Sequence, residues 1–417
     1  MSIASLSARS RGLRTLDPGR LRRPLIALLL IAGELLLVGG TFTHVGNRLL
    51  YDFQGGLFDA GRAILHGHTP YRPGFLAHQA AVMHHGGVAV GESADHPFSV
   101  PVYPALANVL IVPLALLPFW LAGTLFTLAS PAAMVGGLRL LGVTDRRCVA
   151  VALVSWPFLF GLFLGAIGPF LLLGAGLAWR LRARLWPAGA ALAAIIAAKV
   201  FPWPMAVWLL ITGRRRAFAV TVALGIVLTF AAWALIGFDG LAQYPRMLSE
   251  VSSLQENRAD SLVGVLVIAG IGSGIAHVAG FVLAGILLVV AWRIARTRPD
   301  GERPAFGLTV IAALTATPIV WQHYMVLLFV PVALLSPRWS RAWLIPVVPG
   351  IVTALSWLVI PGNPNYGPYS AQALREILPW LAAEAMIVWM LLAPDRARDV
   401  VASRRPRGRT GHPALSD

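Results

Sequence analysis

The sequence has little charge for its length. Only 12% of the 417 residues are charged and 57% are hydrophobic, with a mean hydropathy of +0.72. Soluble domains carry about 25% charged residues, so the composition excludes an ordinary soluble globular domain. Apolar runs long enough to cross a bilayer recur from Pro24 almost to the C-terminus. The sequence therefore predicts an all-α polytopic membrane protein.

Cysteine and lysine are nearly absent. Cys148 is the one cysteine, which excludes an internal disulfide and a thiolate metal cluster. Lys199 is the one lysine among 34 basic residues. The arginines fall in short clusters between apolar runs, as cytoplasmic loops beside anionic lipid do. The net charge of +16 therefore indicates membrane orientation and not a nucleic-acid partner. The clusters are Arg9 to Arg23, Arg146 and Arg147, Arg180 to Arg184, Arg214 to Arg216, Arg293 to Arg303, Arg338 and Arg341, and Arg396 to Arg409.

The charge pattern divides the chain into three regions. Residues 1–23 form a basic cytoplasmic N-terminus. Residues 24–393 form the membrane domain, with a long first exoplasmic loop at 43–100. Residues 394–417 form an arginine-rich cytoplasmic tail. No small-residue cleavage site follows the first apolar run, so we expect that run to be retained as a helix. The apolar segments predict a bundle of roughly 11–13 transmembrane helices. These segments are 24–42, 101–118, 119–141, 149–161, 164–180, 187–212, 217–237, 261–272, 275–295, 305–336, 342–360 and 377–393, with further polar loops at 238–260 and 361–376.

Prolines interrupt several of the apolar segments. The interruptions are Trp156-Pro157, Gly168-Pro169, Pro202 to Pro204 and Thr317-Pro318. Non-helical backbone at membrane depth survives only where protein buries it or where it lines a wet cavity. The broken helices therefore predict a cavity inside the bundle.

Lys199 lies in an apolar run and is followed by a Pro-Trp-Pro stretch that ends its helix. An ionisable residue at mid-bilayer costs about 2.5–3.5 kcal/mol on insertion scales, so it is a functional candidate. One interpretation is a lysine that snorkels to the interface near a helix end. The other is a partner for a buried anion, such as the phosphate of a lipid-linked substrate. For Glu34 and Glu384, hydrogen bonding between helices is the preferred interpretation.

Asp52 follows the first expected span where the chain leaves the membrane, in the stretch LLYDFQGGLFDAGRAILHGHTPY. Residues 56–65 could form a short amphipathic helix at the interface that ends at Gly67. A carboxylate at this position suits a general base that acts on a hydroxyl. A helix cap or a solvated loop acid is the alternative for Asp52.

His323 follows the Thr317-Pro318 break and is flanked by Trp321 and Tyr324. A single histidine in an apolar stretch is often a satisfied packing residue. Beside a helix break, it becomes a candidate partner for a phosphate or a proton.

Six of the ten histidines lie between His66 and His96, together with Asp59, Glu92 and Asp95. Their spacing fits no metal motif, and His84-His85 lies in a glycine-rich stretch. We therefore expect no metal site.

Four stretches, in order, resemble the motifs of glycosyltransferase family 87, membrane mannosyltransferases of the GT-C superfamily. The first stretch is Asp52-Phe53 with Gly67 to Tyr71, which resembles an Asp-Phe opening followed by Gly-x-x-Pro-Tyr, and the second is Val102 to Leu106 with Pro113 to Pro118, which resembles an aromatic Tyr-Pro pattern with Pro-Leu-Ala-Leu-Leu-Pro. The third is Lys199 to Pro202 with Arg214 to Arg216, which resembles a Lys-x-x-Pro before an Arg-Arg turn. The fourth consists of Pro318, Trp321, His323 and Tyr324, which resemble a Pro-x-x-Trp-x-His-Tyr.

The resemblance implies a GT-C-type bundle and an enzyme that moves a sugar, mannose, from a polyprenyl-phosphate donor to a hydroxyl of a glycan or glycolipid. Asp52 would be the catalytic base, and Lys199 and His323 would bind the donor phosphate. We also expect five residues at the substrate cavity: Asp59, Tyr71, Tyr103, Trp321 and Tyr324. The family implies inversion of configuration, no cofactor and no metal.

The composition is rich in arginine, alanine, glycine and leucine, which is associated with GC-rich bacterial genomes. We therefore expect a bacterial plasma membrane, with membrane lipids as neighbours and the active site on the exoplasmic side. The alternative is a transporter or flippase of a lipid-linked sugar or anionic substrate, because such proteins also have broken helices around a charged midplane. Transporters tend to show two similar halves, and no internal repeat is visible. No cytoplasmic loop is large enough for a nucleotide-binding domain, which disfavours a nucleotide-sugar donor.

Overall fold

The computed structural model describes residues 49–71, 102–359 and 371–393. Within these ranges the regular structure is helical, with no strand, which confirms the all-α prediction. The expected first span at 24–42, with Glu34, and most of the histidine-rich loop lie outside the described residues.

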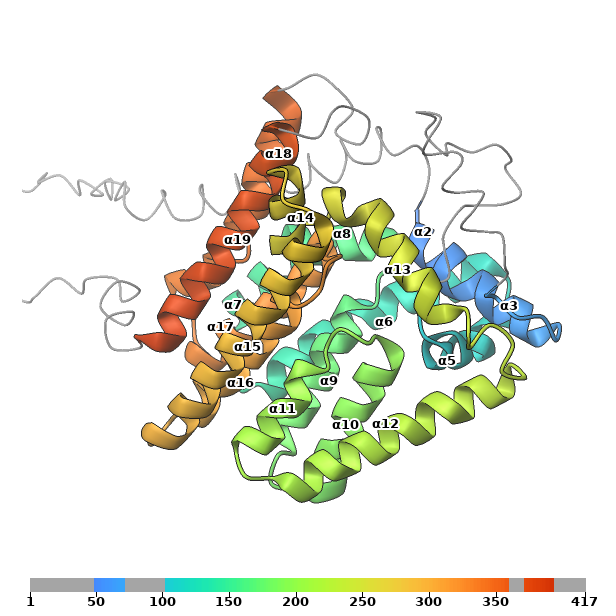
Figure 1. Ribbon diagram of the computed structural model, residues 1–417, viewed down its shortest axis with the longest axis horizontal. Coiled ribbons are helices and arrows are strands. Elements are labelled where there is room, and N and C mark those ends of the chain that lie inside the picture. The colour runs from blue at the N-terminus through green and yellow to red at the C-terminus, as the bar shows by residue number, and fades with distance from the viewer. Residues whose placement is uncertain (1–48, 72–101, 360–370, 394–417) are drawn as a thin grey trace, which may run out of the picture.

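Within the range 102–359, most helices follow one another with short connections (Figure 1). In chain order they are α2 (Tyr51–Phe53), the π-helical η1 (Gln54–Phe58), α3 (Asp59–Leu65), α5 (Ala105–Ala115), α6 (Phe119–Leu140), α7 (Arg146–Leu153), α8 (Trp156–Leu164), α9 (Gly168–Arg180), α10 (Leu185–Ala198), α11 (Pro204–Ile211), α12 (Arg215–Leu235), α13 (Tyr244–Gln255), η2 (Glu256–Arg258), α14 (Leu262–Ile268), α15 (Ser273–Thr297), α16 (Glu302–Thr315), η3 (Gln322–Leu328), α17 (Phe329–Leu335), η4 (Arg341–Leu344), α18 (Val348–Val359) and α19 (Ala371–Leu392).

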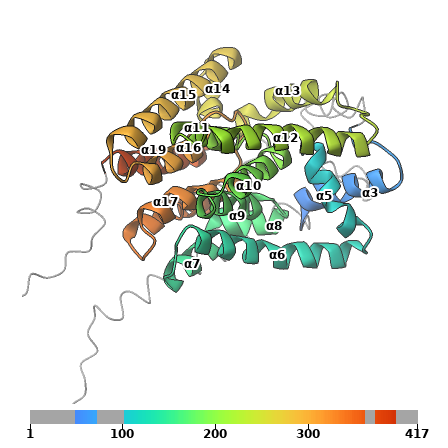
Figure 2. The same ribbon diagram turned by 90° about the horizontal axis from the view of Figure 1, so that it is seen from below.

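Three helices of the described chain, α6, α12 and α15, are long and apolar enough to cross a membrane. The pair α7 and α8 would add a fourth span if it crosses as one unit with its bend of 51°. Shorter apolar helices pack beside them: α6 lies against α9, α10 against α12, and α15 against α16 (Figures 1 and 2). The protein is a polytopic membrane protein, as predicted.

The structure places helix breaks beside the predicted prolines. α7 ends two residues before α8, and residues 165–167 separate α8 from α9. Residues 199–203 separate α10 from α11, and 316–321 separate α16 from η3. The reason is local: a proline lacks the N–H donor that a continuing helix needs. Pro157, Pro169 and Pro204 therefore lie in the first turn of the next helix, where that donor would have no partner.

The prediction of one loop is partly wrong. Residues 238–260 were expected as a polar loop, but they contain α13 and η2. Tyr244, Met247 and Val251 of α13 are buried. Their spacing of three and four residues puts them on one helical face, which is enough to fold a helix whose other positions are polar. α19 likewise begins at Ala371, inside the second expected loop.

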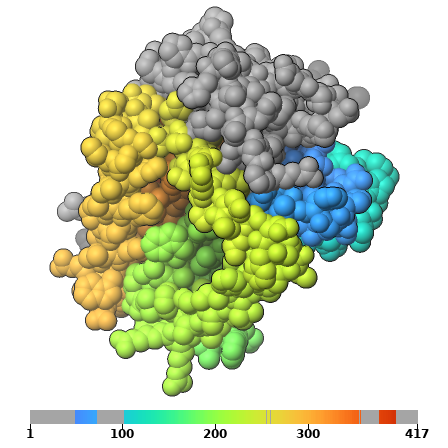
Figure 3. Space-filling model, turned by 45° about the vertical axis from the view of Figure 1, so that its right-hand side comes forward, coloured from blue at the N-terminus to red at the C-terminus, as the bar shows by residue number. Residues whose placement is uncertain are grey.

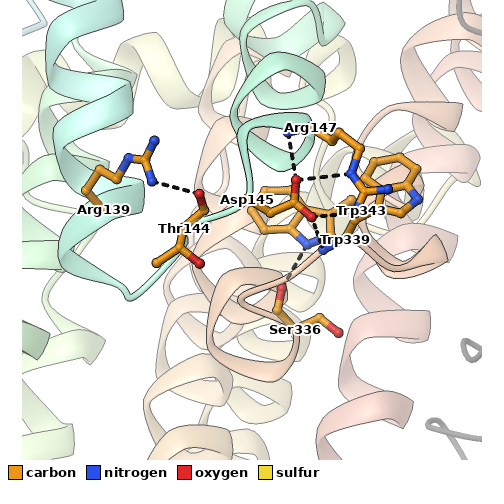
Figure 4. A network of polar contacts seen from close by, with 7 residues as sticks. All are labelled: Arg139, Thr144, Asp145, Arg147, Ser336, Trp339 and Trp343. Carbon is orange, nitrogen blue, oxygen red and sulfur yellow. Dashed lines mark hydrogen bonds and ion pairs between the residues drawn. The ribbon is translucent and has the colours of Figure 1, made fainter.

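A polar network joins the turn before α7 to the 336–341 turn (Figure 4). Asp145 caps α7 by accepting from the Arg147 backbone N–H at 3.0 Å and forms an ion pair with the same arginine at 2.8 Å. Asp145 also accepts from the Trp339 backbone N–H at 3.1 Å. Arg147 lies over the Trp339 ring at 5.9 Å. Asp145 therefore fixes the start of α7 to the 336–341 turn.

Candidate active site

Asp52 is positioned by its two neighbours. Leu50 has a φ of 62°, a left-handed conformation that turns the chain into α2, and its N–H donates to the Phe163 carbonyl at 2.8 Å. Phe53 is fully buried, and its ring lies 4.6 Å from that of Phe126. The Asp52 side chain is therefore held at the C-terminal end of α8, with about a quarter of its surface exposed (26%).

Three glycines at the break between α8 and α9 bring two chain segments together. A Cβ on Gly165 would lie 2.5 Å from Phe53 Cβ, and Gly165 has a φ of +72°. A Cβ on Gly161 would lie 3.3 Å from His323 Cβ, and one on Gly168 would lie 3.0 Å from the His323 carbonyl. Only small residues allow backbones to approach this closely. The break at 161–168 therefore sets the distance between the Asp52 and His323 segments.

Lys199 lies at the end of α10, where Pro202 and Pro204 prevent the helix from continuing. Its backbone is extended, with a φ of −153°. The Nζ atom lies 4.1 Å from the centre of the Tyr103 ring and 5.2 Å from that of Tyr324. Both distances are those of cation–π contacts. The ammonium is therefore directed between two aromatic rings of the protein.

His323 completes the cluster. Its side chain is 3% exposed, and its Nε2 lies 3.9 Å from Asp52 Oδ2. Neither ring nitrogen has a hydrogen-bond partner among the described residues. The ring centre lies 4.2 Å from that of Tyr324. Buried polar groups are normally hydrogen-bonded, so an imidazole without a hydrogen bond beside a charged pair is a group that a ligand can satisfy.

Charge and burial oppose each other at Asp52. Burial raises the pKa of Asp52 to about 6, and the positive charge of Lys199 limits that rise. The rings of Tyr103 and Tyr324 both lie next to the Lys199 ammonium. The cluster of Asp52, Lys199, His323, Tyr103 and Tyr324, here called the acid–cation cluster, combines a base that is ionised at neutral pH with a cation that can hold an anion.

The other expected cavity residues differ in their positions. Tyr71 is buried behind the cluster: its hydroxyl donates to the Tyr103 carbonyl at 2.8 Å and accepts from Asn108 Nδ2 at 3.0 Å. Trp321 is partly buried and directly precedes η3. Asp59 lies on α3 with its side chain exposed.

Sequence reasoning missed two polar residues next to the cluster. Asp260 is 5% exposed and Gln322 is 6% exposed. The Trp156 indole donates to the Gln322 side chain, whose Nε2 donates to Asp260 Oδ1 at 3.5 Å. A signal existed, because Asp260 is the last acid before an apolar segment and Gln322 interrupts the aromatic motif beside His323.

The space-filling view shows a recess on one face of the protein, between α13 and the orange helices α15 and α16 (Figure 3). α13 belongs to the segment between α12 and α14. Tyr244 of α13 donates to the Val102 carbonyl at 3.1 Å, so α13 is attached directly to the backbone next to Tyr103.

Comparison with known proteins gives a family and two relatives. The model of glycosyltransferase family 87 matches residues 102–321, which is more than half of the chain. Two similar proteins are both named polyprenol-phosphate-mannose-dependent alpha-(1-2)-phosphatidylinositol pentamannoside mannosyltransferase. The one from Mycolicibacterium smegmatis is 26% identical over 315 residues, 70% of this chain and 67% of its own length. The one from Mycobacterium tuberculosis is 27% identical over 369 residues, 78% of this chain and 80% of its own. No solved structure gives a significant match.

Proposed function

Since this chain belongs to glycosyltransferase family 87, we propose that it transfers mannose from a polyprenyl-phosphate donor to a hydroxyl of a glycolipid or glycan, with inversion of configuration. The enzyme acts in the bacterial plasma membrane, and its site faces the exoplasmic side. Residues 24–393 form the catalytic domain, flanked by the cytoplasmic N-terminus and tail. The names of both relatives support mannose as the sugar and a phosphatidylinositol mannoside as the acceptor class.

In this proposal Asp52 is the general base. Its carboxylate takes the proton from the acceptor hydroxyl as the oxygen attacks the anomeric carbon from the face opposite the phosphate. The bond between the anomeric carbon and the phosphate oxygen breaks, and its electron pair leaves with the polyprenyl phosphate. A pKa of about 6 keeps Asp52 ionised at neutral pH and makes it a better base than an ordinary aspartate.

Lys199 and His323 hold the donor phosphate. The leaving phosphate is a weak base that needs charge stabilisation more than a proton. The positive charge of Lys199 acts on both Asp52 and His323, so a phosphate bound between them would meet a cation. His323 can donate one ring N–H to a phosphate oxygen. Tyr103 and Tyr324 keep the ammonium in place through their ring faces.

The observation that carries the proposal is the meeting of Asp52, Lys199 and His323 from three distant parts of the chain in one cluster. A flippase of a lipid-linked sugar needs a phosphate site but does not need a general base next to that site. Family membership also disfavours that alternative.

The test incubates purified protein with labelled polyprenyl-phosphate mannose, with and without a phosphatidylinositol mannoside. Acceptor-dependent release of polyprenyl phosphate together with a mannosylated lipid is expected. Asp52→Asn should abolish transfer while the protein still binds the donor. Full transfer by this variant would remove Asp52 from the role, and unchanged donor with the wild type would refute the function.

A further inference from the structure

Residues 260 and 261 lie directly beside the acid–cation cluster. They form hydrogen bonds with the non-helical segment 316–321, which leads into η3 and His323. The backbone N–H groups of Ala316 and Thr317 still donate to carbonyls of α16, but the chain from Pro318 to Val320 is not helical. Buried backbone polar groups need partners, so something outside the segment must supply them.

Asp260 and Ser261 supply these partners at three successive places. The Ser261 hydroxyl donates to the Pro318 carbonyl at 2.8 Å. The Asp260 backbone N–H donates to the Val320 carbonyl at 2.7 Å. The Asp260 carboxyl accepts from the side chain of Gln322 at 3.5 Å, and the Gln322 backbone N–H lies close enough to the same carboxyl to lower its pKa.

The Gln322 N–H is the first free donor of η3, and no side chain of the residue before the helix caps it. A helix start leaves such donors unsatisfied, and an acceptor oxygen there stabilises the helix end. The Asp260 carboxyl, which contacts the Gln322 side chain, therefore lies where it can cap η3 from another element. The capped residue is the immediate neighbour of His323, and the other side of Gln322 is held by the Trp156 indole.

We infer that Asp260 is a positioning residue for transfer: by capping η3, it fixes His323 where the donor phosphate binds. This inference rests on the proposed function for the role of His323. Asp260 follows α13 and η2 in the same segment, so it also connects the segment 238–260 to the acid–cation cluster.

Burial and the nearby Glu376 raise the pKa of Asp260 well above its ordinary range. In either protonation state the carboxyl keeps an acceptor oxygen for Gln322. Asparagine has the same shape and also offers one oxygen, so it should replace Asp260 with little loss. Alanine removes the acceptor oxygen, so Asp260→Ala should lose activity.

The experiment measures donor and acceptor kinetics for Asp260→Ala, Asp260→Asn and Ser261→Ala, with Glu250→Ala as the control for loss of an acid from α13. The Glu250 side chain is 41% exposed and forms an ion pair with Arg246. Asp260→Ala should lower kcat/KM for the donor about tenfold, as the loss of one or two hydrogen bonds would. The change should come through KM for the donor, with KM for the acceptor unchanged. Asp260→Asn and Glu250→Ala should stay within about twofold of the wild type.

A second arm repeats Asp260→Ala in a His323→Ala background. If Asp260 acts through His323, Asp260→Ala should cause no further loss of kcat/KM for the donor in the His323→Ala background. An equal tenfold loss in both backgrounds would overturn the inference, as would a wild-type KM for the donor in Asp260→Ala. Should Asp260→Ala fail to fold, Ser261→Ala serves the same cycle, with a smaller expected loss and the same dependence on His323.

Binding of polyprenyl phosphate, followed by tryptophan fluorescence, separates this inference from the proposed function. If the wild type binds polyprenyl phosphate but transfers no mannose, the function fails. The inference then stands or falls on whether Asp260→Ala weakens that binding only when His323 is present.

Discussion

Gly165→Ala tests how tightly the α8–α9 break fixes the active site. Gly165 has a φ of +72°, which costs an alanine about 1 kcal/mol. The added Cβ would also lie 2.5 Å from Phe53 Cβ, and 3.3 Å from the Phe53 backbone nitrogen. Carbon atoms in ordinary contact are about 3.5–4.0 Å apart, so the two segments must separate by about 1 Å.

Phe53 cannot absorb this shift by rotating its ring, because the clash involves its Cβ and its backbone. The ring also packs against Phe58, Phe119 and Phe126. Overpacking of this kind costs about 1–3 kcal/mol, so the total loss of stability should be about 2–4 kcal/mol. Asp52 precedes Phe53 and moves with it. A displacement of about 1 Å in a reacting group can cost about 100-fold in rate.

Gly213→Ala is the matched control. Gly213 has a φ of +78°, and no atom lies within 4 Å of where its Cβ would be. The control therefore carries the backbone cost without the clash. Thermal unfolding in detergent and mannosyl transfer would be measured for both variants below their melting temperatures. Gly165→Ala should lose about 100-fold in kcat, and Gly213→Ala should keep wild-type kcat. Equal kcat for the two variants would refute the argument that close approach at Gly165 positions Asp52.

Further predictions concern charge, aromatic support and stability. Because the pKa of Asp52 is raised to about 6, kcat/KM should fall as pH drops through about 6, where the base becomes protonated; a profile flat from pH 5 to 8 would contradict a base with this pKa. Lys199→Ala should lower kcat/KM for the donor about 100-fold, and Lys199→Arg should recover part of it; a selective loss of acceptor binding in the alanine variant would contradict the phosphate assignment. Tyr71→Phe removes the hydrogen bond to the Tyr103 carbonyl and should cost about 1 kcal/mol of stability in a melting experiment, whereas unchanged melting would show that Tyr103 needs no support from Tyr71. Asp145→Ala should lower the melting temperature without changing kcat, since its contacts join α7 to the 336–341 turn; a loss of kcat in folded protein would link that turn to catalysis.

The positions of the helices and their breaks could be predicted from the sequence, because both depend on local properties. Apolar runs set the helices, and prolines set the interruptions near 157, 169, 202 and 318. α13 was missed because a polar helix with one apolar face looks like a loop when only average hydropathy is considered. A test at the helical period, applied to Tyr244, Met247 and Val251, would have found it.

The acid–cation cluster could be predicted only in part. Asp52, Lys199 and His323 are conspicuous because charged or titratable groups are costly in apolar surroundings. Their distances depend on Gly161, Gly165 and Gly168, where two backbones approach closely. A glycine in a membrane segment does not reveal which other segment it will touch, so this contact becomes visible only in three dimensions.

Asp260 shows a second limit of the same kind. In the sequence it is the last acid of an expected loop, where a solvated carboxylate is the ordinary interpretation. In the structure it accepts from the side chain of Gln322, the first residue of a helix 62 residues later in the chain. A cap within one element leaves a local pattern of a polar residue next to a helix start, but a cap supplied by another element leaves none. Broken helices near membrane depth create free backbone donors, so the donor at each such break is where a search for distant caps should begin. Here that search leads from the Thr317-Pro318 break to Asp260, and from Asp260 to His323.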